Sequence, residues 1–451
     1  MNTSVNIIEA KLQDYIIRLH PSLLETEITA EGDQIKLSFG QKDTLAKLET
    51  SSILQLNEIH LSTACFSELG MPIHHQPYQI CINESGDGLR LGPLITVLTG
   101  IVIKNKIPDF LTLEHFLLEL HEYVLQNGGF LYVSNFSAIK DNFVEGYYYS
   151  NRHKWEKDFF PLPDVIYNRI HSRKKERKTA FQRFVTECQS QGIPLFNEKF
   201  LSKWEVYETL SKHESISSFI PETFLYKDLN QLLQLLVAYQ DIFIKPIHGS
   251  QGRDIIRLKM ENDYYVFYHT AKSSEITFEN RQDLIQTLKP VLASSQSIIQ
   301  KTIPLERVHY KVLDFRILVI PNHKKVWQVI SSVVRFSKPN SFVSNLAQGG
   351  EMEKAQSFLR EHYGEKAGKQ LWNTMKNFSI QIAEILSKEM NVHIGELGID
   401  IAVDEDKQIW LIEVNSKPSK NFTQDSGIRP SVKALYHYFE CVWLERSISN
   451  D

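Results

Sequence analysis

The stretch that most constrains the fold is residues 395–417, with the sequence GELGIDIAVDEDKQIWLIEVNSK. Residues 399–403 and 409–414 alternate in the manner of half-buried strands, and the polar run 404–408 between them suits a turn. This pattern predicts a β-hairpin.

The register of this hairpin decides which side chains share a face. A turn centred in the polar run places Asp400 opposite Glu413, and Asn415 lies two residues further along the same face. Leu411 is expected on that face too, as an apolar patch beside the carboxylates. The other face is expected to be core and carries Ile399, Ile401, Val403, Trp410, Ile412 and Val414.

Two carboxylates placed opposite each other repel, so the arrangement is costly unless a cation or a proton lies between them. Oxygen ligands suit Mg²⁺ or Mn²⁺, and Mg²⁺ is commonly bound together with phosphates. The stretch therefore indicates a metal site beside a nucleotide. A solvated polar face of an edge hairpin is the alternative, and the stretch alone leaves both open.

Composition places the chain among globular proteins. A length of 451 residues suits about three domains, and 42% hydrophobic and 23% charged residues are ordinary values. The net charge of −4 gives no general attraction to nucleic acid. The four cysteines are widely spaced, without zinc-site spacing, which favours a reducing cytoplasm.

Neither a signal peptide nor a membrane span is expected. The N-terminus lacks a basic segment followed by an apolar one. The longest apolar run, residues 91–103, is too short for a span and contains Gly92, Pro93 and Gly100.

The chain divides into three expected regions. Residues 1–75 hold short alternating runs and predict a small β-rich unit, and residues 76–195 alternate strand and helix patterns, beginning with a strand at 78–82. Residues 196–445 carry the informative motifs. The basic run 169–178, RIHSRKKERK, is open to two interpretations: a solvated helix start, or a surface for nucleic acid or an acidic partner.

Lys245 ends an expected strand at residues 241–246, in which Phe243 shares its face. The loop that follows contains Gly249, Ser250 and Gly252. Glycines let backbone N–H groups approach phosphate oxygens, and a lysine adds a positive charge. The loop is not a P-loop, and a tight hairpin with a surface lysine is the alternative.

Three further side chains stand on expected strands. Gln300 could read an adenine edge, because an amide both donates and accepts. Arg316 and Arg335 have the planar forks that match phosphoryl groups or carboxylates. Taken singly, each has a plainer interpretation as a surface side chain.

The order of these residues resembles the ATP-grasp superfamily of carboxylate–amine ligases. The motifs DFRILV, VVRF, SNLAQGG, GIDIAVD and LIEVNSKP look like its RimK-type branch. The whole chain, including GLRLGPLITVLTG at residues 88–100, is similar to the YheC/YheD family of endospore coat-associated proteins.

The resemblance implies an α+β, ATP-grasp fold: two subdomains that grip ATP, preceded by an α/β pre-ATP-grasp domain and the β-rich unit. It implies that Asp400, Glu413 and Asn415 hold two Mg²⁺ ions (or Mn²⁺), and that Arg316, Arg335 and Asn345 handle the transferred phosphoryl group. Nucleotide contacts are implied for Lys203, Lys245, Gly249, Ser250, Gly252, Gln300, Lys301, Ile303, Asp314 and Leu411.

The function implied is an ADP-forming ligase that acts through an acyl phosphate on an unknown pair of carboxylate and amine substrates. Two departures from the RimK pattern stand out: Lys301 replaces an acidic residue, and Ser419 replaces the glycine after Pro418. The family name implies a cytoplasmic protein of sporulation, associated with the endospore coat and its proteins. A non-catalytic ATP-binding or scaffold protein of the coat is the alternative.

Overall fold

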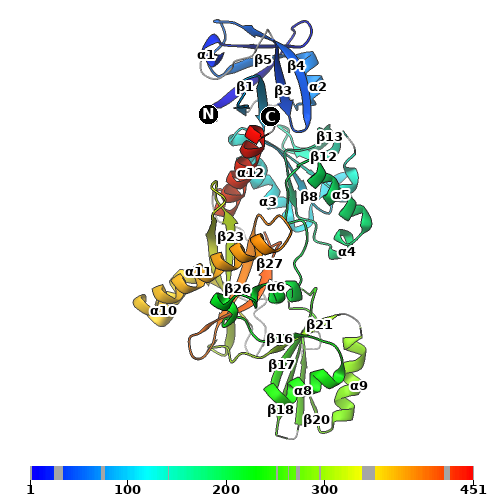
Figure 1. The fold of residues 1–451 in the computed structure, drawn as a ribbon, viewed down its shortest axis with the longest axis vertical. Helices are drawn as coiled ribbons and strands as arrows, with labels where there is room; N and C mark the ends of the chain where they lie inside the picture. Colours follow the sequence, from blue (N-terminus) through cyan, green and yellow to red (C-terminus); the bar gives the residue numbers. More distant parts are fainter. Residues whose placement is uncertain are drawn as a thin grey trace.

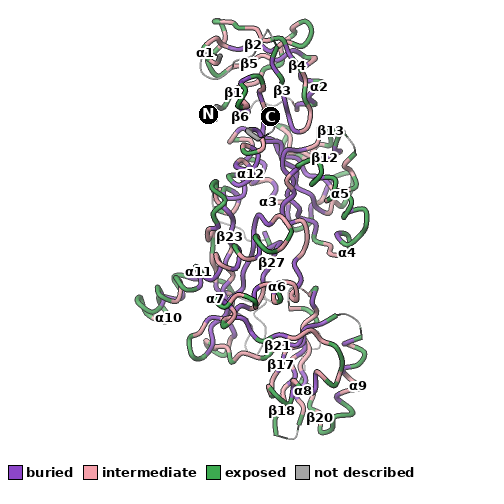
Figure 2. The backbone as a smooth tube through the Cα atoms, viewed as in Figure 1, coloured by how far each residue is buried: buried purple, intermediate pink, exposed green. Residues whose placement is uncertain are grey.

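A computed structural model describes residues 3–24, 34–72, 77–140, 142–249, 252–262, 264–270, 275–293, 296–337, 351–420 and 427–449. The molecule is elongated, with the N-terminal strands at one end and residues 223–301 at the other (Figure 1). The buried residues concentrate in the strands along the length of the molecule (Figure 2).

The N-terminal unit is a closed barrel with strand order β1-β5-β2-β4-β3-β7-β6. Its strands are β1 Thr3–Ala10, β2 Ile16–Leu19, β3 Gln34–Phe39, β4 Lys42–Thr50, β5 Glu58–Ser62, β6 Tyr78–Ile82 and β7 Gly88–Gly92, with helices α1 Pro21–Leu24 and α2 Thr63–Leu69. The strand predicted at 78–82 therefore exists, but its partners are β1 and β7 and not the α/β sheet. The predicted boundaries near residues 75 and 195 stay predictions.

The second region holds a six-stranded sheet with order β13-β12-β11-β8-β14-β15. Its strands β8, β11, β14 and β15 run parallel, as the alternating pattern predicts. The strands are β8 Leu94–Leu98, β11 Phe130–Ser134, β12 Val144–Tyr149, β13 Trp155–Phe160, β14 Val165–Asn168 and β15 Leu195–Phe196. The helices are α3 Glu114–Gln126, α4 Arg173–Glu176, α5 Thr179–Ser190 and the C-terminal α12 Pro430–Ser449, and a hairpin of β9 Val102–Lys104 and β10 Ile107–Asp109 lies apart.

The lobe at the far end is a six-stranded sheet covered on one face by two helices. Its elements are β16 Thr223–Leu225, α8 Leu229–Tyr239, β17 Asp241–Pro246, β18 Ile256–Glu261, β19 Tyr264–His269, β20 Glu275–Phe278, α9 Arg281–Leu292 and β21 Ser297–Lys301. Ile242 and Ile244 point into the helix-covered core. Strand alternation then turns Phe243 and Lys245 to the other face, as predicted.

The central sheet carries the hairpin, in the order β25-β24-β23-β26-β27. Its strands are β22 Arg307–Val308, β23 Lys311–Pro321, β24 Trp327–Phe336, β25 Met352–Lys354, β26 Leu397–Val403 and β27 Ile409–Asn415. The helices packed around it are α6 Lys203–Leu210, α7 Glu214–Ser217, α10 Ala355–Tyr363 and α11 Glu365–Glu389. One face packs on α11 and α6 in a continuous apolar core, which leaves the other face for polar side chains.

The predicted hairpin register is confirmed at its polar end, since Asp400 pairs with Glu413. The register then shifts next to this pair, and Leu411 lies opposite Ile401. Ile412 is the extra residue of this β-bulge. The predicted place of Leu411 beside the carboxylates is therefore wrong: it belongs to the core, whereas Trp410 pairs with Ala402 on the carboxylate face.

Candidate functional site

A row of charged side chains extends across the strands on the polar face of the central sheet. Arg335 on β24 pairs with Asp314 on β23, and Arg316 on β23 pairs with Asp400 on β26. Arg335 Nε donates to Asp314 Oδ1 at 2.5 Å, and its Nη2 lies 2.9 Å from Asp400 Oδ2. We call Asp314, Arg316, Arg335, Asp400, Glu413 and Asn415 the sheet cluster.

Asp400 lies at the centre of the sheet cluster. Arg316 grips it with both Nε and Nη2, the latter at 2.8 Å, and Asn415 Nδ2 lies 3.4 Å from Oδ2. Burial alone would raise the pKa of Asp400, but the charges of Arg316 and Arg335 outweigh burial and hold that pKa below its usual value. Asp400 is therefore an ionised carboxylate in this arrangement.

Lys203 joins the two halves of the predicted site. It opens α6 after Ser202, whose side chain caps the helix. Its Nζ donates to the Gly249 carbonyl oxygen at 2.6 Å and to Glu413 Oε1 at 2.9 Å. The glycine loop after β17 and the metal-ligand candidate on β27 are thus bridged by one ammonium group.

Lys245 and Gln300 lie together on the polar face of the far lobe. Lys245 Nζ is 2.5 Å from Gln300 Oε1, and Gln300 Nε2 donates to Thr223 Oγ1 at 2.9 Å. Burial, together with the charge of Lys203, lowers the pKa of Lys245 to about 8, and Glu413 opposes this shift. The charges of Lys245 and Glu413 therefore act on each other across the two lobes.

The remaining predicted nucleotide contacts are placed less centrally. Lys301 ends β21 with its backbone N–H donated to the Glu222 carbonyl oxygen at 3.0 Å. Ile303 is half-buried in the segment that leads to the central sheet. Gly252 has a φ of 66°, which favours glycine. Ser250 and Asn345 lie outside the described residues.

The donor set suits a hard divalent cation. Asp400 and Glu413 supply carboxylate oxygens and Asn415 an amide oxygen, all from two neighbouring strands, which is the chemistry Mg²⁺ and Mn²⁺ prefer. Within the described ranges, no group of three or more His, Cys, Asp and Glu side chains is arranged to hold a metal. A cation here would need further oxygen ligands, which nucleotide phosphates provide.

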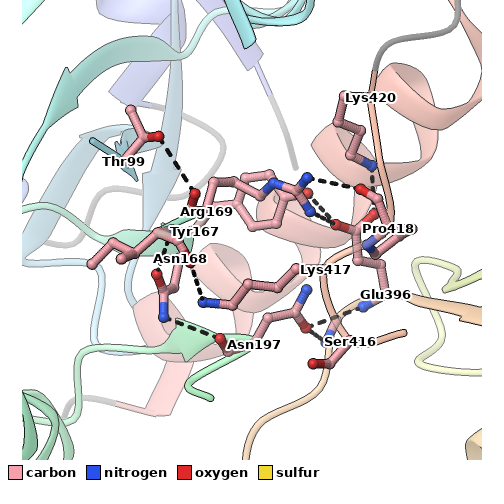
Figure 3. Close-up of polar contacts among 12 residues, drawn as sticks. Thr99, Tyr167, Asn168, Arg169, Asn197, Glu396, Ser416, Lys417, Pro418 and Lys420 are labelled. Carbon is pink, nitrogen blue, oxygen red and sulfur yellow. Dashed lines mark hydrogen bonds and ion pairs between the residues drawn. The ribbon is translucent and has the colours of Figure 1, made fainter. Parts of the chain in front are cut away.

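A second polar cluster lies at the base of the hairpin, where the strands meet the α/β sheet (Figure 3). Arg169 Nη1 lies 2.8 Å from Glu396 Oε1, and Arg169 Nη2 donates to the Pro418 carbonyl oxygen at 2.7 Å. Lys420 Nζ lies 2.5 Å from Glu396 Oε2, while Lys417 pairs with Glu176. We call Arg169, Glu176, Glu396, Lys417 and Lys420 the junction network.

The junction network is not predicted from the sequence, although the basic run 169–178 contains two of its residues, Arg169 and Glu176. A solvated helix start is correct for Lys174 and Lys175, which are exposed, and wrong for Arg169, which is fully buried. The departure at Pro418-Ser419 falls in the same network. Two of its ion pairs, Arg169–Glu396 and Lys417–Glu176, join residues more than 200 positions apart along the chain, so no local pattern reveals them.

Two lobes with facing polar sides, joined by a lysine that spans the glycine loop and the acidic hairpin, are the arrangement of an ATP-grasp protein. The chain belongs to the YheC/D like ATP-grasp family, whose model matches residues 192–442.

Its relatives include two proteins of Bacillus subtilis (strain 168). Endospore coat-associated protein YheD is 28% identical over 374 residues, which cover 80% of each chain. Endospore coat-associated protein YheC is 25% identical over 283 residues, 60% of this chain and 75% of that protein.

Among solved structures, the VanG D-Ala:D-Ser ligase from Enterococcus faecalis covers 78% of this chain and 98% of its own, at 12% identity and a TM-score of 0.47. Along the described part of the chain, we find no helix both long and apolar enough to span a membrane.

Proposed function

We propose that this protein is an ATP- and Mg²⁺-dependent carboxylate–amine ligase. Lys203 carries the proposal, because it contacts Gly249 in the glycine loop and Glu413 in the acidic hairpin at the same time. A nucleotide bound between the lobes would find its phosphates near two lysines and its metal near Asp400, Glu413 and Asn415.

In the reaction, the γ-phosphoryl group of ATP passes to a substrate carboxylate, giving an acyl phosphate and ADP. An amine then displaces phosphate and forms an amide. Arg316 and Arg335 neutralise the charge that spreads over the transferred group, with Asn345 assisting. Mg²⁺ held by the hairpin would add Lewis-acid stabilisation. Positioning and electrostatics supply the catalysis, and no side-chain nucleophile is required.

The adenine is proposed to lie against the far lobe, between Gln300 and the backbone of Lys301 and Ile303. Asp314 is bonded to Arg335, so its role at the nucleotide is to orient that arginine. Leu411 drops out of the proposed contacts, because the bulge turns it into the core.

One observation favours the alternative, a non-catalytic ATP-binding or scaffold protein. Repulsion between Asp400 and Glu413 would call for a cation, but Arg316 and Arg335 neutralise Asp400, and Lys203 neutralises Glu413. The hairpin therefore needs no metal to balance the charges of its two carboxylates. With relatives named for the endospore coat, either function would operate in the sporulating cell.

Thermal unfolding with and without Mg²⁺ and ATP tests nucleotide binding. Wild-type protein should melt at a higher temperature with both present, and Lys245→Ala and Glu413→Ala should lose the shift. Lys212→Ala and Glu405→Ala are matched controls at exposed positions and should keep it. No shift in the wild type would refute both the ligase and a nucleotide-dependent scaffold.

Turnover separates the ligase from the scaffold. ADP and phosphate release would be measured against pools of amino acids, peptides and cell-wall precursors. Release that depends on one pool, and is lost in Arg316→Gln, supports the ligase. ATP binding without release in any pool favours the scaffold.

A further inference from the structure

The basic run 169–178 lies against the candidate site. Arg173, the first residue of α4, holds its guanidinium carbon 4.7 Å from the centre of the Phe200 ring. Lys417 Nζ lies 4.8 Å from the centre of the same ring. Phe200 lies three residues before Lys203, and Lys417 lies two residues after Asn415, so this contact places Arg173 near Lys203 and near the Asn415 end of the sheet cluster.

Positive charge around this contact exceeds negative charge. The junction network holds three cations, Arg169, Lys417 and Lys420, against the carboxylates Glu176 and Glu396. Arg169 Nε and Arg173 Nη1 are buried, and neither has a hydrogen-bond partner among the described residues. Buried donors without partners and buried charge without a counter-charge both cost stability, so an anion bound here would be favoured.

Arg177 lies one helical turn after Arg173 and donates its backbone N–H to the Arg173 carbonyl oxygen at 3.1 Å, and His248 precedes Gly249, whose carbonyl oxygen accepts from Lys203. Burial lowers the pKa of Arg173, Glu413 and Glu176 oppose that shift, and Arg177 adds to it. Burial, Arg177 and Arg173 in turn lower the pKa of His248, the residue before Gly249. We call Arg173, Arg177 and His248 the basic cluster. It extends from the neighbourhood of Glu413 to the start of the glycine loop.

The basic cluster can reach a ligand, because Arg177 and His248 are exposed and Arg173 is half-buried. Arg316 and Arg335, which would meet the transferred phosphoryl group, come from the central sheet, whereas Arg173 and Arg177 come from the α/β region. These two arginines form no ion pair with a described carboxylate, in contrast to the arginines of the sheet cluster. Their charge is available to a substrate.

We propose that the basic cluster binds an anionic group of the carboxylate substrate, so that this substrate carries a carboxylate or phosphate in addition to the carboxylate that is activated. The guanidinium of Arg173 is the principal contact, since its fork matches both groups. This inference rests on the proposed ligase function and specifies its substrate class.

Calorimetric titration of the full-length protein, in about 150 mM salt with Mg²⁺ and a non-hydrolysable ATP analogue, tests it. The probes are tri-glutamate against tri-glutamine for the carboxylate source, and phosphoserine against serine for the phosphate source. At least one charged probe should bind and its neutral counterpart should not. Arg173→Gln should weaken that binding about tenfold or more, and Arg173→Lys should restore part of it.

Lys174→Gln is the matched control, because it removes the same charge from an exposed neighbour on the same short helix. It should bind the charged probe as the wild type does, and Arg177→Gln should bind it more weakly. The proposal is overturned if neither charged probe binds to the wild type at 10 mM, or if Arg173→Gln binds as well as Lys174→Gln.

Nucleotide binding is measured first, so that the two proposals fail separately. Arg173→Gln should keep the full thermal shift with Mg²⁺ and ATP; loss of that shift would mean that Arg173 serves the nucleotide and would overturn the assignment to the substrate. A wild type that shows no shift would refute the ligase itself, whatever the charged probes do.

Discussion

The sheet cluster and the junction network both join arginines to carboxylates, but they differ in burial and in balance. In the sheet cluster each carboxylate has a facing cation and the arginines keep some exposure, 14% for Arg316 and 11% for Arg335. In the junction network Arg169 and Glu396 are fully buried and cations outnumber carboxylates. The side chains of the sheet cluster can therefore exchange their present partners for a ligand, whereas the junction network holds the base of the hairpin in place.

The largest effect is expected from breaking the junction network. Glu396→Gln leaves Arg169 and Lys420 buried without their carboxylate, and should lower the free energy of unfolding by about 3–5 kcal/mol. Urea unfolding measures it. Asp43→Asn, which breaks an exposed pair with Lys36, should change little. Equal losses in the two variants would contradict the difference drawn between buried and exposed pairs.

Breaking the sheet cluster should cost ligand binding more than folding. Asp400→Asn removes a carboxylate that two arginines share, yet Arg335 keeps Asp314. Stabilisation by ATP and Mg²⁺, about 2.7 kcal/mol at a hundredfold excess over Kd, should disappear. Asp406→Asn makes the same chemical change in the exposed turn of the hairpin and should retain it. A variant of Asp400 that still responds to ATP would remove this residue from the site.

Mild acid should act mainly on histidines that burial keeps neutral, and His121 is one of them. Burial lowers the pKa of His121 to about 4, below its value in the unfolded chain, so the unfolded state binds the proton first and stability falls as pH drops from about 6.5 towards 4. The loss between pH 7 and pH 5 is about 2 kcal/mol.

His121→Gln should remove that part of the pH dependence in urea unfolding at the two pH values. Burial also lowers the pKa of His171 and His393 to about 4, so some acid sensitivity remains. His115→Gln, at an exposed position of the same helix, should leave the dependence as in the wild type. An unchanged pH dependence in His121→Gln would assign the effect to other groups.

The smallest effect on folding is expected at the glycine loop. A Cβ added to Gly249 would meet Pro246 atoms at 3.4 Å, an ordinary contact, so Gly249→Ala should change the unfolding free energy by less than about 1 kcal/mol. Its affinity for ATP should fall several-fold, because the backbone can no longer approach phosphate as closely. Gly100→Ala, with open space around it, is the control, and equal ATP affinities would place the phosphates elsewhere.

The sequence predicts the sheet cluster better than the junction network because strands have a period of two. That period places Asp400 opposite Glu413, and Lys245 on the face away from Ile244, without any knowledge of the rest of the fold. It fails at Ile412, where one extra residue shifts the register and turns Leu411 over. Nothing in the local sequence marks that bulge.

The junction network depends on how the α/β region docks on the hairpin. Arg169 pairs with Glu396, which lies 227 residues further along the chain. The sequence of a basic run does not indicate whether its side chains are solvated or buried. Likewise, the strand β6 joins the barrel and not the α/β sheet, because it pairs with β1 from the start of the chain. Such contacts are set by tertiary packing, about which the periodicity of the sequence carries no information.

The C-terminal helix α12 shows what this docking means for the autonomy of the ATP-grasp region. Its side chains Leu435, Phe439 and Trp443 are buried in one core with Phe116 and Tyr167 of the α/β region, and Phe439 packs on Tyr167 with ring centres 5.5 Å apart. A chain that started at residue 192 would leave this apolar side of α12 uncovered. The region that matches the family therefore relies on the α/β region to bury α12, and we expect the two to unfold together.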